Sequence, residues 1–174
     1  MTSAKPARLA LAASACLGLM AGAAFAAEPA ATPAPAPARA VPAAEFLARN
    51  AKAKGVTVMP ALQYQVVRSG PADGAHPKLS DDVTVHYEGK LTTGEVFDSS
   101  FKRGEPNTFP LRPLIPGWTI ALQQMRPGDE WIIYVPPEMA YGAEDKGPIP
   151  ANSVLIFRIQ LISAQPHAKD APAG

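Results

Sequence analysis

Residues 83–100, VTVHYEGKLTTGEVFDSS, decide the fold of this chain because they predict a β-hairpin. Val83, Val85 and Tyr87 alternate with polar residues, which is the period of two expected of a half-buried strand. A Thr-Thr-Gly turn separates this strand from a second one that runs into Asp98. Two serines follow, and such short polar side chains favour hydrogen bonds to the nearby backbone. The Asp98 carboxylate is therefore either a turn-former or a group that meets a ligand, and periodicity alone favours the turn.

The composition is that of a globular domain with appendages. The chain has 174 residues, of which 16 are basic and 15 are acidic. This near balance gives no indication of binding to nucleic acid or to an anionic membrane surface. Five of the 20 prolines gather between residues 28 and 42, so the total overstates the proline content of the folded part. The length is that of a single domain.

Residues 1–26 have the three parts of a secretory signal peptide. Two basic residues open it, an apolar stretch of small residues follows, and residues 24–26 form an A-x-A cleavage site. A transmembrane anchor is the less favoured alternative, because the stretch is short and no stop-transfer pattern follows. A lipid anchor on Cys16 is also less favoured, because the apolar run before it is short. We expect cleavage near Ala26 and a periplasmic or secreted protein without membrane attachment.

Four segments follow the predicted signal peptide. The Ala/Pro-rich tract lacks the large apolar residues that a core needs, and repeated proline favours an extended, semi-rigid spacer. A short helix is expected at residues 43–54, with a proline before its start and a glycine after its end. The predicted boundaries are 27–42 for the linker, 43–60 for the short helix and its lead-in, 61–165 for the main domain and 166–174 for a flexible tail.

The main domain combines strand patterns with one clear helix. At residues 116–125, Trp118, Ala121, Leu122 and Met125 fall at helical spacing and form one apolar stripe. A tryptophan on such a stripe is usually part of the core. Further strands are predicted at 62–67, 131–135 and 154–162, a basic loop at 101–106 and a short extended piece at 109–111. About five strands and one internal helix indicate an α+β fold, with an antiparallel sheet and the helix across one face.

The usual catalytic constellations are absent from the sequence. The three histidines are far apart and lack metal-ligand spacing, and the motifs of nucleophilic hydrolases, phosphate-binding loops and zinc proteases are missing. We therefore expect no metal and no cofactor. What remains is a set of apolar and aromatic residues around one carboxylate, which suits a ligand held by shape. Such a pocket also suits rotation about an X-Pro bond, a reaction that requires no nucleophile, acid or metal.

Four motifs carry a resemblance to a known family. They are VHYEGKLTTGEVFDSS from residue 85, LIPGWTIALQQMRPGDEW from residue 114, PPEMAYG from residue 136 and IPANSVLIF from residue 149. In this order they resemble the FKBP-type peptidyl-prolyl cis-trans isomerases, over residues 62–164. The helix ending near residue 55 and the strand after it further resemble the bacterial periplasmic branch that includes the macrophage infectivity potentiators. The resemblance implies a twisted antiparallel sheet wrapped around one short helix.

The resemblance also implies roles for individual residues. Trp118 is expected as the floor of the pocket, Asp98 as its polar contact and Tyr141 as a hydroxyl donor. The chain departs from the family pattern at Asn107, where many relatives have an aromatic residue, and at Lys146, where they often have histidine. The residues expected to act in catalysis are Tyr87, Phe97, Asp98, Ile115, Trp118, Tyr141 and Phe157, and those expected to bind substrate are Phe109, Leu114 and Ile149.

The activity implied is peptidyl-prolyl cis-trans isomerisation in the folding of exported proteins. The expected substrates are proline-containing polypeptides that are unfolded or extended, and macrolides such as rapamycin are expected ligands. A non-catalytic chaperone that holds prolyl or apolar segments is the alternative, and it would use the same pocket. Many relatives dimerise through a long N-terminal helical domain, which is reduced here to residues 43–54, so we expect a monomer.

Overall fold

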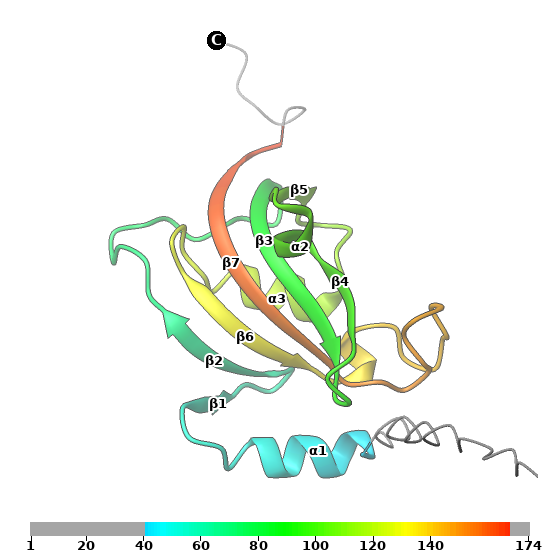
Figure 1. Ribbon diagram of the computed structural model, residues 1–174. Helices are drawn as coiled ribbons and strands as arrows, with labels where there is room; N and C mark the ends of the chain where they lie inside the picture. Colours follow the sequence, from blue (N-terminus) through cyan, green and yellow to red (C-terminus); the bar gives the residue numbers. More distant parts are fainter. Residues whose placement is uncertain (1–40, 168–174) are drawn as a thin grey trace, which may run out of the picture. The chain divides into compact units, whose positions relative to one another are not determined.

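Within residues 41–167, a sheet of seven antiparallel strands frames the domain, and its two longest strands lie side by side (Figure 1). These are β3 (Asp81–Leu91) and β7 (Leu155–Pro166), which pair along their whole lengths. The strand order is β1-β2-β6-β7-β3-β4, and β5 also pairs with β3. The other strands are β1 (Val56–Val58), β2 (Gln63–Arg68), β4 (Val96–Ser99), β5 (Asn107–Pro110) and β6 (Glu130–Val135).

The computed structural model describes residues 41–167, which fall within one compact unit. The predicted signal peptide, nearly all of the predicted linker and residues 168–174 of the predicted tail lie outside the described residues. The tail was expected to begin at Pro166, which is instead the last residue of β7. The boundaries of the other segments stay predictions.

The predicted hairpin is present, and its pattern sets the two faces of the sheet. Along β3, Val83, Val85 and Tyr87 are buried, while the residues between them are partly exposed. The period of two expected from the sequence is therefore confirmed for this strand. β7 turns alternate residues toward the same core, namely Leu155, Phe157, Ile159 and Leu161.

A single helix, α3 (Pro116–Leu122), packs on this apolar face of the sheet (Figure 1). The predicted stripe of apolar residues, including Trp118 and Met125, is buried. Gly117 allows the helix to approach β6 closely, since a Cβ atom there would lie 2.4 Å from Cγ1 of Val135. The helix ends at Leu122, earlier than predicted, yet the turn that follows still delivers Met125 to the core.

The N-terminal helix is shorter than predicted. α1 (Ala43–Asn50) ends before residue 54, because after Asn50 the chain tightens into turns closed by hydrogen bonds between residues three apart. None of its side chains is buried. The helix is attached to the sheet through Gln63, whose side-chain amide donates to the carbonyl of Leu47 and accepts from Asn50, each at 2.9 Å.

Short elements account for the remaining differences from prediction. The predicted basic loop at residues 101–106 begins inside a helix, α2 (Ser100–Arg103), and a 3-10 helix, η1 (Pro137–Met139), follows β6. The sequence does not predict β1, and β5 begins two residues before the predicted extended piece. Elements of three or four residues are too short to display a hydrophobic period. The described residues therefore contain seven strands rather than about five.

Candidate active site

A cavity of about 290 Å³ is lined by residues of α3, β3, β4, β5 and β7 and of the loops beside them. Nine of the ten predicted site residues line it. The exception is Ile149, which is buried outside the lining and whose carbonyl accepts a hydrogen bond from the N–H of Lys146 at 3.0 Å. The full lining consists of Tyr87, Phe97, Asp98, Phe109, Pro113, Leu114, Ile115, Trp118, Tyr141 and Phe157.

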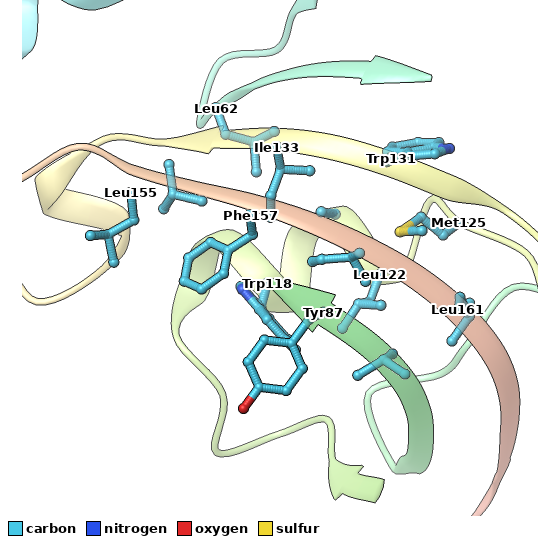
Figure 2. Packing of buried hydrophobic residues seen from close by; sticks show 14 of the residues in the cluster. Leu62, Tyr87, Trp118, Leu122, Met125, Trp131, Ile133, Leu155, Phe157 and Leu161 are labelled. Carbon is cyan, nitrogen blue, oxygen red and sulfur yellow. The ribbon is translucent and has the colours of Figure 1, made fainter. Parts of the chain in front are cut away.

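Trp118 lines the cavity, and the neighbouring rings of Tyr87 and Phe157 meet it at nearly right angles. The ring centroids of Tyr87 and Phe157 each lie 5.2 Å from that of Trp118, with interplanar angles of 80° and 88°. Aromatic rings prefer this edge-to-face arrangement because a positive ring edge meets a negative ring face. The buried indole N–H has no hydrogen-bond acceptor within the described residues, and Figure 2 shows it directed toward Phe157.

The Phe97 ring adds to this group beside Phe157, and a glycine makes room for both rings. The rings of Phe97 and Phe157 are edge to face, with centroids 5.7 Å apart. Both rest against Gly89 of β3, where a Cβ atom would lie 2.5 Å from Cε2 of Phe97 and 2.9 Å from Cε1 of Phe157. Even a methyl group at this position would therefore force these rings to move. Gly89 is a site residue that the sequence interpretation does not identify, although a glycine inside a strand signals close approach.

The polar side of the cavity is a hydrogen-bonded network around Asp98. The Tyr87 hydroxyl donates to one carboxylate oxygen, and Nη1 of Arg103 donates to the other at 2.5 Å. Nη2 of Arg103 also donates to the Tyr87 hydroxyl at 3.2 Å and to Oδ1 of Asn107 at 2.8 Å. The carboxylate is thus held by two side chains, one from β3 and one from α2. Asp98 itself lies within β4 rather than in a turn.

This network fixes the protonation states at the cavity wall. Burial alone would raise the pKa of the Asp98 carboxyl, but the hydrogen bonds from Tyr87 and Arg103 and the guanidinium charge outweigh burial, so the pKa lies below its usual value. Burial, together with the hydrogen bond to Asp98, raises the pKa of the Tyr87 phenol. At neutral pH the wall therefore presents an anionic carboxylate and a neutral hydroxyl donor.

Two groups at the rim remain available to a ligand. Within the described residues, neither the N–H of Ile115 nor the hydroxyl of Tyr141 makes a hydrogen bond to the protein. Tyr141 is partly exposed, and the ammonium of Lys146 lies 6.0 Å from its ring centroid. Lys146 in turn pairs with Glu144 at 2.6 Å. The rim thus combines an N–H donor and a hydroxyl with an apolar interior.

Comparison with known proteins decides the family. A family model described as FKBP-type peptidyl-prolyl cis-trans isomerase matches residues 73–162, which is about half of the chain and contains every residue of the cavity lining. The chain belongs to the FKBP-type peptidyl-prolyl cis-trans isomerase family. The resemblance predicted from the four sequence motifs is therefore confirmed.

Named relatives of this FKBP-type chain are bacterial. It is 51% identical to the peptidyl-prolyl cis-trans isomerase Mip of Coxiella burnetii over 122 residues, which cover 69% of this chain and 52% of the relative. It is 49% identical to the FKBP-type isomerase FkpA of Aeromonas hydrophila over 127 residues, which cover 72% of this chain and 47% of the relative. The chain thus spans about half the length of these curated relatives, and both names support the predicted bacterial branch that includes the macrophage infectivity potentiators.

Solved structures support the predicted α+β fold. FkpA from Escherichia coli matches with a TM-score of 0.67 and 42% identity, covering 71% of this chain and 58% of that one. A peptidyl-prolyl cis-trans isomerase from Pseudomonas syringae pv. tomato matches with a TM-score of 0.65 and 34% identity, covering 71% of this chain and 90% of that one. The fold class expected from the sequence is confirmed.

Two departures from the FKBP pattern have a visible structural role here. Asn107 stands where an aromatic residue is frequent, and it accepts a hydrogen bond from Arg103 instead of adding a ring to the wall. Lys146 forms an ion pair beside Tyr141. Arg103 itself is not among the predicted site residues, because in sequence it is simply one charge of a basic loop. Only α2 brings its guanidinium back to Asp98.

Residues 41–167 were also searched for metal-binding groups and for membrane-spanning helices. No group of three or more His, Cys, Asp or Glu side chains within residues 41–167 is arranged to hold a metal ion. In that same part of the chain, no helix has the length and apolar character needed to cross a bilayer.

Proposed function

We propose that this protein is a peptidyl-prolyl cis-trans isomerase that accelerates rotation about X-Pro bonds. The observation that carries the proposal is the cavity itself, in which aromatic and aliphatic side chains enclose a space floored by Trp118, with Asp98 held at one wall. The names of the relatives from Coxiella burnetii and Aeromonas hydrophila support it. The proposed substrates are proline-containing polypeptides in unfolded or extended form.

The chemistry of X-Pro rotation explains why an apolar cavity suffices. Rotation meets a barrier of about 18–20 kcal/mol because the amide must lose its resonance. Uncatalysed, it takes tens to hundreds of seconds. Charge separation between the carbonyl oxygen and the nitrogen is smaller in the twisted transition state than in the planar ground state. An apolar enclosure therefore disfavours the planar amide relative to the transition state, and no proton transfer is required.

Each part of the cavity has a role in this proposal. The prolyl ring lies over Trp118, against the faces and edges of Tyr87 and Phe157. The N–H of Ile115 and the hydroxyl of Tyr141 hold the peptide carbonyls on either side of the rotating bond. The Asp98 carboxylate orients the Tyr87 wall and supplies the electrostatic complement to the twisted amide. A gain of a few thousandfold requires only about 5 kcal/mol of preferential transition-state binding.

An isomerisation assay tests this proposal directly. The protein without residues 1–26 is mixed with a Leu-Pro peptide, and the cis-to-trans rate is followed with and without protein. We expect acceleration that a macrolide such as rapamycin inhibits, since the macrolide would occupy the same cavity. Wild-type protein that gives no acceleration, yet suppresses aggregation of an unfolded client, would replace the isomerase with a non-catalytic chaperone.

We further propose that the protein acts outside the cytoplasm as a monomer. One relative from Legionella longbeachae, 48% identical over 122 residues, is named an outer membrane protein. Export with cleavage near Ala26 rests on the signal pattern in the sequence. Mass analysis of the mature protein tests the cleavage site, and light scattering at micromolar concentration tests the monomer. A stable dimer would contradict the monomer, and a full-length mass would contradict cleavage.

A further inference from the structure

The outer edge of β3 is shared by two short strands, and a gap lies between them. Residues 82–85 of β3 pair with β5, and residues 88–90 pair with β4. α2 lies between β4 and β5 in the chain, and it contacts β3. His86 and Tyr87 therefore have no strand partner on this edge, although a backbone N–H or C=O left unpaired in the interior costs free energy.

A single side chain fills this gap at Tyr87. The backbone N–H of Tyr87 donates to Oγ of Ser100 at 2.7 Å, and the same hydroxyl donates back to the backbone carbonyl of Tyr87 at 3.2 Å. In an antiparallel ladder the backbone of one opposing residue supplies both of these bonds. Ser100 reproduces that pairing with its hydroxyl, and it is fully buried. Its neighbour Ser99 acts only locally, accepting from the N–H of Lys102 as the cap of α2.

Counting donors assigns the tautomer of the neighbouring histidine. Nδ1 of His86 lies 3.1 Å from the same Ser100 hydroxyl. That hydroxyl has one hydrogen, which the carbonyl of Tyr87 already accepts, and two acceptor lone pairs, of which the N–H of Tyr87 uses one. The remaining lone pair is satisfied only if His86 carries its hydrogen on Nδ1. All three bonds then coexist, and none of the groups is left unpaired.

The histidine ring is held in place by packing on α2. It stacks on Phe101 with ring centroids 4.9 Å apart and planes inclined by 16°. The guanidinium of Arg158 lies 5.1 Å from the centre of the Phe101 ring, and its Nε donates to Glu130 at 2.7 Å. The donor to Ser100 is therefore fixed by contacts on the side of the sheet away from the cavity.

We propose that Ser100 is a positioning residue for the site, fixing the main chain of Tyr87 with His86 as its Nδ1–H donor. The position of the Tyr87 backbone matters to the site because the Tyr87 side chain lines the cavity and its hydroxyl donates to Asp98. A shift of the Tyr87 backbone displaces that hydroxyl directly. The inference rests on the proposed isomerase function for its catalytic consequence, but its structural content does not.

Ser100→Ala tests the role, with Thr84→Val as the matched control. Thr84 lies on the same strand, and its hydroxyl bonds to that of Thr108 at 2.9 Å, so the control removes a β3 bond that does not involve Tyr87. For Ser100→Ala we expect hydrogen exchange at the Tyr87 amide to accelerate about tenfold or more and kcat/KM to fall about tenfold. Thr84→Val keeps both values. Ser100→Cys, which keeps a weak donor and acceptor, falls between wild type and Ser100→Ala.

Nitrogen NMR of the His86 ring supplies a measurement that needs no activity. In the wild type, the neutral imidazole of His86 should carry its hydrogen on Nδ1. In Ser100→Ala, this preference for Nδ1 should be lost. A wild-type ring protonated on Nε2 alone overturns the donor assignment. Folded Ser100→Ala with wild-type exchange at Tyr87 overturns the positioning role. If Ser100→Ala does not fold, the positioning role is tested by amide exchange and kcat/KM in Ser100→Cys and by the His86 ring signal of the wild type. Wild-type values in Ser100→Cys would then overturn the role. An inactive wild type would remove the proposed function, while exchange and ring signals still test the role of Ser100.

Discussion

The two tryptophans of this domain are almost equally buried and yet occupy opposite kinds of surroundings. Trp118 is 5% exposed and Trp131 is 7% exposed. Trp131 lies flat on Tyr64, with ring centroids 4.4 Å apart and planes inclined by 14°, whereas the rings around Trp118 meet it at nearly right angles. Figure 2 shows Tyr87, Trp118 and Phe157 grouped together and Trp131 apart from them.

This difference separates a structural aromatic cluster from one that forms a cavity. Parallel stacking covers the face of each ring with the other, so it leaves no space for a ligand. Edge-to-face packing keeps rings upright around the floor, and the space between them is the cavity that Trp118 lines and Trp131 does not. Exposure alone would not distinguish the two tryptophans. The orientation of the neighbouring rings does.

The largest expected effect comes from truncating each tryptophan in turn. Trp118→Ala and Trp131→Ala should each lower the free energy of unfolding, by about 3–5 kcal/mol where the removed ring leaves a cavity. Only Trp118→Ala should also lower kcat/KM of the folded fraction, because only it removes the floor. Denaturant unfolding and a Leu-Pro peptide assay measure the two quantities. Equal loss of kcat/KM in folded Trp131→Ala would contradict the division into two clusters.

The next effect tests how tightly the upright rings are held. Gly89→Ala should cost about 1–3 kcal/mol of stability through overcrowding and should reduce kcat/KM, because the new methyl group displaces Phe97. Gly70→Ala is the matched control, since its Cβ would lie 2.4 Å from the carbonyl oxygen of Pro127, which is not part of the cavity lining. We expect the control to lose stability but retain turnover. Unchanged turnover in folded Gly89→Ala would show that the rings adapt.

A smaller effect is expected from the polar wall. Asp98→Leu keeps the volume but removes the carboxylate, so kcat/KM should fall tenfold or more, equivalent to about 1.4 kcal/mol. Its melting temperature should change little, because the Asp98 side chain is 41% exposed and its ion pair is screened by solvent. Glu45→Leu, which removes the partner of Arg49 in α1, is the control and should leave turnover unchanged. Full turnover in folded Asp98→Leu would remove Asp98 from the mechanism.

The smallest expected effect is that of pH. The pKa of Asp98 is lowered on folding, so its stabilising contribution is present above the ordinary carboxyl value of about 3.9 and is lost as pH falls through the folded value. We therefore expect kcat/KM to stay level from neutral pH down to about 5. A pH–rate profile of wild type against Asp98→Asn measures this. A step between pH 5 and 6 that Asp98→Asn abolishes would contradict the lowered pKa.

The strands and the helix of the core were predictable because each is long enough to show a period. β3 alternates from Val83 to Leu91, β7 buries every second residue from Leu155 to Leu161, and α3 with the turn after it places four apolar residues on one stripe. β1, α2 and η1 are each four residues or fewer, and their formation depends on what they pack against. Local sequence could not reveal them.

For the site, the lining residues could be predicted from the sequence, but the contacts between them could not. The family resemblance supplied nine residues that the structure brings together around the cavity, but their catalytic roles stay predictions. The residues that contact Asp98 and Tyr87 were harder to predict from the sequence. Arg103 reaches it only because α2 reverses the chain, and Ser100 acts on Tyr87 across a gap in strand pairing. Both contacts depend on register and helix placement, which no spacing in the sequence encodes.

Two ion pairs flank the cavity, and their net charge bears on the rate at which a polypeptide would encounter it. Asp98 pairs with Arg103 on one side of the cavity, and Glu144 pairs with Lys146 beside Tyr141 on another. Each pair is neutral overall, so neither attracts acidic or basic polypeptides from a distance. Without charge steering, we expect an association rate constant of about 10⁵–10⁶ M⁻¹s⁻¹ that depends only weakly on salt concentration. For the proposed isomerase, we therefore expect selection to follow contact, by the fit of a prolyl ring, with little dependence on the net charge of the polypeptide.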